Sequence, residues 1–544
     1  MRLARLGSFH QTRLSFLRAL LRTLGAGRWS FDRPVFDIDV RGVGVAVYRA
    51  RGPERTYSLV CFSHDLPPEK RTDRVIAEEW DATFALFDGE PAAADIERLR
   101  QNVPRQEAGR CLETELVLAR ANRSVRLFDH VVESLAAGRQ PDAAALAATG
   151  YLMRTTAVYG NGKFGIADRS RIADRPELGG PFRAEMLTVW LIRAFTVDLA
   201  EHLAALRSPQ SAVRLDPALR RSLGVGNATG LGMAPFLVRH PSLLHRWILA
   251  RETALARVRA LDLASAAETA AFASALGKSH ALVAGWRTDD LVQRPRIEAL
   301  RRDLRAVEAH VAAGAWDRPQ PWDALYRWGE AHLSREGQEY LVTLLIEPHG
   351  ALVDDLADAM AIDETALHGI DGTVSPTGFA RLIARHYAWA AAIDFAASDP
   401  QARFWYVSEE KLEPRLGERW REEGADREQP LATARDVMAL AAALQGSPEP
   451  TLAAFLLAHP EHRHAARRVQ IAAGHPYGEI RDNLVDAGMR PIDMLRCKLS
   501  FFGCTRFDPR SDLWLRITMF QGAPFPSDPA PWSDDWIYAG GGEA

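Results

Sequence analysis

Hydrophobic residues recur every three to four positions along most of the chain after Asp73, and this spacing constrains the fold more than any other feature. Two examples are the stretches 73–87 and 185–199, where apolar side chains fall on one face of a helix. Prolines interrupt the pattern near 316–322. The sequence therefore predicts a helical body over residues 73–523, with a subdivision near 316–322.

Before this body, β-branched and aromatic residues alternate with polar ones between residues 32 and 72. The alternation is clearest in the stretches 36–40, 43–48 and 57–62. We therefore expect a fold that is mainly α, a multi-helix globular body with a small N-terminal antiparallel β-sheet over residues 32–72. Residues 524–544 are rich in proline and glycine and predict an irregular tail.

The first 31 residues contain six arginines and no acidic residue, while leucines recur at helical spacing. This pattern predicts a basic amphipathic helical arm over residues 1–31. We expect the arm to pack on the protein's own core or on a partner subunit, and in the second case the protein would be a homo-oligomer. An anionic membrane surface is the alternative partner for such a helix.

Composition and charge exclude several classes of protein. The net charge is −3 and is spread over segments of mixed sign, so nucleic acid is not expected as a partner. The four cysteines are too far apart for a zinc knuckle or a redox pair, which favours a reducing cytoplasm. No run of about 18 apolar residues is present, so no membrane span is expected.

Lysine and asparagine are nearly absent: the chain has five of each. Such scarcity suggests that both were replaced wherever replacement was tolerated. Half of these ten residues lie in three glycine-containing segments, 159–165, 224–232 and 474–503. We therefore interpret the three segments as parts of one functional site.

The first segment, Tyr-Gly-Asn-Gly-Lys from residue 159, places a lysine beside flexible backbone. A lysine next to exposed N–H groups can hold a carboxylate, a phosphate or an enolate oxygen. We predict Tyr159 as an acid/base group, Lys163 as the group that stabilises an oxyanion, and Asn161 as a substrate-binding residue. An exposed turn with a solvated lysine is the alternative.

The second segment, 224–232, has the glycines of a dinucleotide-binding loop but not their spacing, and a helical turn precedes it instead of a strand. We expect a flexible loop in which Asn227 orients the substrate. A plain interhelical loop that needs close backbone approach is equally compatible with the sequence.

The third segment gathers an imidazole, a phenol, a carboxylate, a guanidinium and an amide within residues 474–483. We predict His475 as a proton carrier, and Arg481, Asn483 and Lys498 as substrate-binding residues. A surface loop with ordinary ion pairs is the alternative interpretation.

No complete nucleotide, hydrolase or zinc-protease motif is present, so we predict no cofactor and no metal. The expected function is a cytoplasmic enzyme that acts on a small anionic metabolite, a carboxylate or an acyl compound, by acid/base chemistry in an interhelical pocket. A lyase or hydro-lyase is favoured. Two alternatives stay open: a non-catalytic helical interaction or scaffold protein, and an oxidoreductase that depends on a flavin or a CoA ester.

Overall fold

The structure is a computed structural model, and its chain divides into two compact units. Unit 1 comprises Met1–Phe9, Gly230–Arg257 and Ala359–Cys497, and unit 2 comprises His10–Thr229, Val258–Asp358 and Lys498–Ala544. The structure describes residues 10–70, 79–102, 112–156, 172, 174–230, 241–289, 291, 293–360, 369–395, 405–408, 414–416, 425–428, 432–478, 496–504, 506–509, 514–529 and 536.

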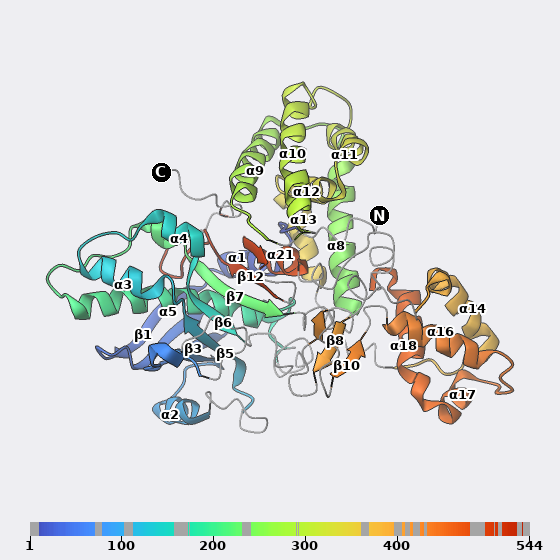
Figure 1. The fold of residues 1–544 in the computed structure, drawn as a ribbon, viewed down its shortest axis with the longest axis horizontal. Helices are drawn as coiled ribbons and strands as arrows, with labels where there is room; N and C mark the ends of the chain where they lie inside the picture. Colours follow the sequence, from blue (N-terminus) through green and yellow to red (C-terminus); the bar gives the residue numbers. More distant parts are fainter. Residues whose placement is uncertain are drawn as a thin grey trace. The chain divides into compact units, whose positions relative to one another are not determined.

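A nine-stranded mixed sheet organises unit 2 (Figure 1), in the order β1-β2-β3-β4-β5-β6-β7-β12-β11. The strands are β1 Ser30–Ile38, β2 Gly44–Arg51, β3 Thr56–Ser63, β4 Ala82–Asp88, β5 Glu115–Arg123, β6 Tyr151–Thr156, β7 Gly224–Gly230, β11 Arg506–Pro509 and β12 Trp514–Met519. Strands β1 to β6 form an antiparallel meander. Strand β7 then pairs with β6 in parallel, which requires a crossover, and helix α5, Arg183–Arg207, lies within it.

The expectation of a mainly α fold with a small N-terminal sheet is therefore wrong, and so is an all-α classification. Within the stretch 73–87, which predicted a helix, residues 82–87 belong to strand β4. The reason is burial on both faces: β4 is buried at six consecutive positions, so its sequence lacks the alternation of a half-buried strand. The stretch 185–199, in contrast, does form part of a helix, α5.

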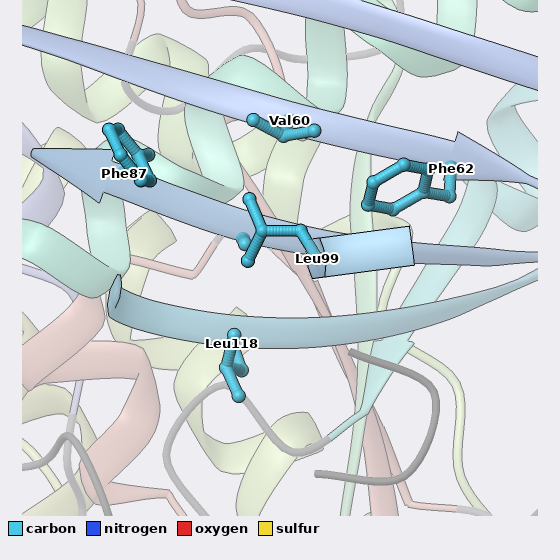
Figure 2. Close-up of a cluster of buried hydrophobic side chains, with 6 residues drawn as sticks. Val60, Phe62, Phe87, Leu99 and Leu118 are labelled. Atoms are coloured by element: carbon cyan, nitrogen blue, oxygen red, sulfur yellow. The ribbon is translucent and has the colours of Figure 1, made fainter. Parts of the chain in front are cut away.

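Two helices cover the two faces of the central strands. On one face, Leu99 of α2, Ala93–Asn102, packs on a hydrophobic cluster from β3, β4 and β5. Figure 2 shows this cluster, whose members are Val60, Phe62, Ala85, Phe87, Leu99 and Leu118. On the other face α5 packs along β2 to β6, with Phe195 edge-on to Phe84 at 5.5 Å between ring centroids.

The N-terminal helix α1, Phe16–Ala26, lies inside unit 2 and packs on α5. Its leucines are buried, and basic side chains of the helix and of the residues just before it pair with acidic partners in the same unit. Arg18 forms a bidentate ion pair with Glu347 at 2.8 and 2.6 Å, and Arg13 forms one with Asp354 at 2.6 and 2.7 Å. These charges are therefore paired within the unit. A homo-oligomer formed through this helix stays a prediction.

The remaining elements of unit 2 are helical. A group of four helices, α9 to α12, contains α9 Ala266–Ala284, α10 Gln293–Ala312, α11 Pro321–His332 and α12 Arg335–Ile346. Pro321 begins α11, so the break near 316–322 is the start of a helix. The shorter helices are α3 Phe128–Ala136, α4 Ala143–Thr149, α6 Pro217–Ser222, α13 Gly350–Val353 and α21 Cys497–Phe502. Helix α21 begins at the final residue of unit 1. The 3₁₀ turns of unit 2 are Pro68–Lys70, Pro176–Leu178 and Asp354–Met360.

Unit 1 contains most of helix α8, Pro241–Arg259, and a helical group in which α14, α16 and α18 pack on one another. Its other elements are α14 Pro376–His386, α16 Ala432–Leu444, α17 Leu452–Ala458, α18 Arg463–Gly474, and 3₁₀ turns at Ala388–Ala392, Pro460–His462 and Pro476–Gly478. A second sheet joins β8 Trp405–Ser408, β9 Pro414–Leu416 and β10 Ala425–Glu428 in antiparallel order β10-β8-β9. Across the described ranges of both units, no helix has the length and apolar character needed to cross a membrane.

Candidate functional site

Most residues that the sequence marks as functional lie outside the described part of the chain. These are Tyr159, Asn161, Lys163, Arg481 and Asn483. Lys498 lies in helix α21, but its side chain is not described. Asn227 and His475 are the two whose surroundings the structure defines.

Asn227 lies on a strand, so the expectation of a flexible loop at this position is wrong. The residue is 2% exposed, and its Nδ2 donates to the backbone oxygen of Thr155 on β6 at 3.1 Å. The glycines around it allow close approach: a Cβ on Gly224 would lie 2.4 Å from the backbone oxygen of Met519, and one on Gly226 2.7 Å from the ring of Tyr151. The glycines therefore serve the packing of β7.

His475 caps the C-terminus of α18 and forms a ring cluster with His245 and Tyr477 in unit 1. His245 on α8 is edge-on to His475 at 5.0 Å and stacks on Tyr477 at 5.3 Å. The backbone N–H of Tyr477 donates to Nδ1 of His245 at 3.2 Å. Since Asn227 belongs to unit 2, a pocket shared by Asn227 and His475 stays a prediction.

The His245 ring predicts a pH dependence of stability. Burial, followed by His475 and Arg246, lowers the pKa of His245 from 6.5 to about 4. Between these values the unfolded chain takes up a proton that the folded state does not, so stability falls as the pH falls through this window and the effect is complete below about pH 4. Urea unfolding at pH 4 to 8 should show a weaker loss in His245→Gln than in the wild type.

His459, which is exposed on the same unit, provides the control for simple removal of an imidazole. His459→Gln should follow the wild-type pH profile of unit 1. Equal slopes in wild type and His245→Gln between pH 4 and 6.5 would refute the role of the buried ring.

Unit 2 contains a groove of about 940 Å³ along one face of α5, which we call the Asp198 groove. Its wall on α5 consists of Leu191, Ala194, Asp198, Glu201, His202 and Ala205. Apart from the adjacent Glu201 and His202, these positions follow one another at intervals of three or four residues and therefore share one helix face. The helix thus presents apolar residues and two carboxylates to the same cavity.

Strands β1 and β2 form the opposite wall through a β-bulge. Asp32 pairs with Arg49 and Val35 with Val47, so two residues of β1, Arg33 and Pro34, face the single residue Tyr48. A bulge turns side chains away from their regular direction and is tolerated at the edge of a sheet. Here it lets Arg33 and Tyr48 approach the same carboxylate on α5.

Asp198 is the centre of the polar contacts in the groove. Its Oδ2 accepts hydrogen bonds from Arg33 Nη1 at 2.8 Å and from the Tyr48 hydroxyl at 2.7 Å. Arg220 of α6 approaches its Oδ1 at 3.9 Å and donates to Ser527 Oγ at 3.3 Å. Two hydrogen-bond donors and a third, more distant cation, from three separate elements, therefore converge on one carboxylate.

The C-terminal segment 520–529 forms the third side of the groove through Pro526, Ser527 and Asp528. Phe525 lies between two guanidinium groups, Arg193 at 3.8 Å and Arg220 at 4.2 Å from its ring centroid. This double cation–π contact connects the segment to α5 and α6.

Burial changes the acid strength of two groups in the groove. It raises the pKa of Glu201, which also accepts a hydrogen bond from the backbone N–H of Leu215 at 3.1 Å. Burial, assisted by Asp198, raises the pKa of Tyr48 well above its usual value, so this phenol stays a donor at neutral pH. Perturbed acids in a cavity are typical of ligand-binding and catalytic sites.

Among the residues whose surroundings are defined, no three His, Cys, Asp or Glu side chains are grouped so that they could hold a metal ion. Sequence reasoning missed the Asp198 groove. The available signal was the helical spacing of Asp198, within the stretch 185–199 that predicts α5, and Glu201, just after it. Comparison with protein families, with curated proteins and with solved structures finds no match for this chain.

Proposed function

Because the comparisons name no relative, the site itself has to support a function, and we propose that unit 2 binds a small carboxylate-bearing metabolite in the Asp198 groove. The observation that carries the proposal is the convergence of Arg33, Tyr48 and Arg220 on Asp198 at the wall of a cavity of about 940 Å³. Cavities of roughly 300 to 1,000 Å³ with a few convergent polar groups are typical of small-molecule sites.

Arg33 is the best placed group to receive a ligand carboxylate. Its side chain is 42% exposed and uses one nitrogen, Nη1, for Asp198. A guanidinium has five N–H donors in a fork that matches a carboxylate, so it can hold a second anion beside Asp198. The apolar lining, which includes Phe31, Phe36, Leu191 and Val213, would contact a hydrocarbon or aromatic body of the ligand.

The chemistry expected from the sequence stays a prediction within this proposal. Glu201, whose pKa is raised by burial, is the groove residue best suited to carry a proton to or from a bound carboxylate compound. Neither the structure nor the comparisons support the description of the chain as an enzyme of the lyase class. A cytoplasmic location likewise stays a prediction.

The proposal is tested by titration calorimetry with carboxylates that have an aromatic or aliphatic body, after a thermal-shift screen. Arg33→Gln should weaken binding about 10- to 100-fold, because a hydrogen bond to a charged partner is lost. Arg41→Gln removes an exposed arginine from the turn between β1 and β2 and should bind like the wild type. If no carboxylate binds, or if both variants bind equally well, the groove is not the site.

A further inference from the structure

The charged residues of the Asp198 groove are balanced in sign, and this balance limits what can bind there. The lining contains four arginines and four carboxylates, which are Arg33, Arg49, Arg214, Arg220, Asp32, Asp198, Glu201 and Asp528. A site for a simple anion would be expected to carry an excess of cations. The lining of this groove has no such excess.

Part of this charge is already used within the wall. Arg49 forms a bidentate pair with Asp32 at 3.0 and 2.6 Å and a further bond to Glu90 at 2.6 Å. The Asp528 carboxylate accepts the backbone N–H of Phe525 at 2.8 Å. Apart from the Arg49–Asp32 pair, the lining contains the cations Arg33, Arg214 and Arg220 and the carboxylates of Asp198, Glu201 and Asp528.

Asp198 and Glu201 lie one helical turn apart on the groove face of α5. A ligand carboxylate on Arg33 would lie near the Asp198 carboxylate, and the two anions would compete for the same cation. Burial raises the pKa of Glu201, and the hydrogen bond from Leu215 N–H opposes that rise. A ligand with a carboxylate alone would therefore bring a further negative charge to the end of the groove that already holds the Asp198 and Glu201 side chains.

We infer that the ligand of the Asp198 groove is zwitterionic: it carries an ammonium group that pairs with Asp198 and Glu201, beside the carboxylate that pairs with Arg33. This inference rests on the proposed function and narrows it to the chemical class of amino acids and related amino-carboxylates. Such a ligand leaves the charge of the groove unchanged on binding. Each of its charged groups meets a group of opposite sign.

Two matched sets of compounds separate this inference from the proposal on which it rests. One set is phenylalanine, 3-phenylpropanoate and 2-phenylethylamine, and the other is norleucine, hexanoate and pentylamine. Within each set the hydrocarbon body is similar. The first compound carries both charges, the second only the carboxylate and the third only the ammonium group. In titration calorimetry, at least one zwitterion should bind the wild type 10-fold or more tightly than both of its partners.

Variants assign the two charges to residues. Asp198→Asn keeps the size of the side chain. It should weaken binding of the zwitterion at least 10-fold, whereas the carboxylate-only compound should bind as tightly as to the wild type or more tightly. Glu201→Gln should weaken binding of the zwitterion in the same way. Among the described contacts Glu201 has none with Tyr48 or Arg33, so this variant also provides the test if Asp198→Asn fails to fold. Arg33→Gln should weaken both carboxylate-bearing compounds.

Binding of a carboxylate-only compound as tightly as its zwitterion, with loss in Arg33→Gln, would overturn the zwitterion inference and keep the proposed function. Tightest binding of an amine would overturn both, because the carboxylate would then play no part. If none of the six compounds bound to folded protein, the proposed function and the zwitterion inference would both be contradicted. If Asp198→Asn and Glu201→Gln both bound the zwitterion with wild-type affinity, only the zwitterion inference would be overturned.

Discussion

Replacing Arg193 with methionine is expected to lower the free energy of unfolding of unit 2 by about 3 to 5 kcal/mol. Arg193 is fully buried on α5, and its guanidinium donates to four backbone oxygens, those of Leu223 at 2.6 Å, Ala523 at 2.7 Å, Pro524 at 3.2 Å and Arg221 at 3.0 Å. Methionine has a similar length and a good helix propensity, so the loss would come from these carbonyls and not from the helix.

The effect is large because both sides of the interaction are buried. Burial lowers the pKa of Arg193 well below its usual value, so the site disfavours the charge of this guanidinium. The four carbonyl oxygens compensate that charge without a carboxylate in hydrogen-bond contact. If the guanidinium is removed, those carbonyls lose a charged donor, and buried acceptors without a donor are destabilising.

Arg207 on the same helix is exposed and provides a matched control. Arg207→Met should change the unfolding free energy by no more than about 0.5 kcal/mol. The measurement is urea unfolding, with hydrogen exchange of β7 and α5 to report on unit 2 itself. Similar values for the two variants would contradict the central role of the buried guanidinium.

Arg193 also links the core to the candidate site. It holds the segment 520–525 from one side of Phe525, and Arg220 lies on the other side of the same ring. The next residues of that segment, Pro526 to Asp528, line the groove. The position of Arg220 relative to Asp198 therefore depends on a residue that does not line the groove.

The sequence predicted the helices better than the sheet, and burial explains the difference. Helix α5 is long enough for its period to be recognised although it is buried almost all round. Strands β1 to β3 lie in the region where a small sheet was expected. Strand β4, buried on both faces, could not be distinguished from a helix by periodicity, and β7 was hidden by its glycines, which are needed for close packing.

The candidate site was harder to predict than the fold, and the reason lies in the composition. Scarcity of lysine directed attention to Lys163 and Lys498, but all except five of the 67 basic side chains are arginine. A chain that uses arginine in place of lysine will also use it to bind anions, and Arg33 and Arg220 are not conspicuous among so many. Their convergence on Asp198 depends on a bulge and on a C-terminal segment that local pattern does not reveal.

Glu347→Leu is expected to lower the unfolding free energy of unit 2 by about 3 kcal/mol. Arg18, whose side chain has no exposed surface, would lose the carboxylate that it contacts through two nitrogens, whereas Glu347 itself is 12% exposed. A guanidinium transferred from water to this position needs a nearby anion to offset its desolvation. Urea unfolding of the variant measures the loss.

The double variant Arg18→Met/Glu347→Leu decides whether the loss comes from the isolated charge. Removing both partners leaves no buried ion, so the double variant should be more stable than Glu347→Leu alone, with a coupling between the sites of 1 kcal/mol or more. Glu97→Leu breaks an exposed pair with Arg100 and should change stability by about 0.5 kcal/mol or less. If the two substitutions at the buried pair were simply additive, the Arg18–Glu347 ion pair would contribute nothing to the attachment of this basic helix to its own unit.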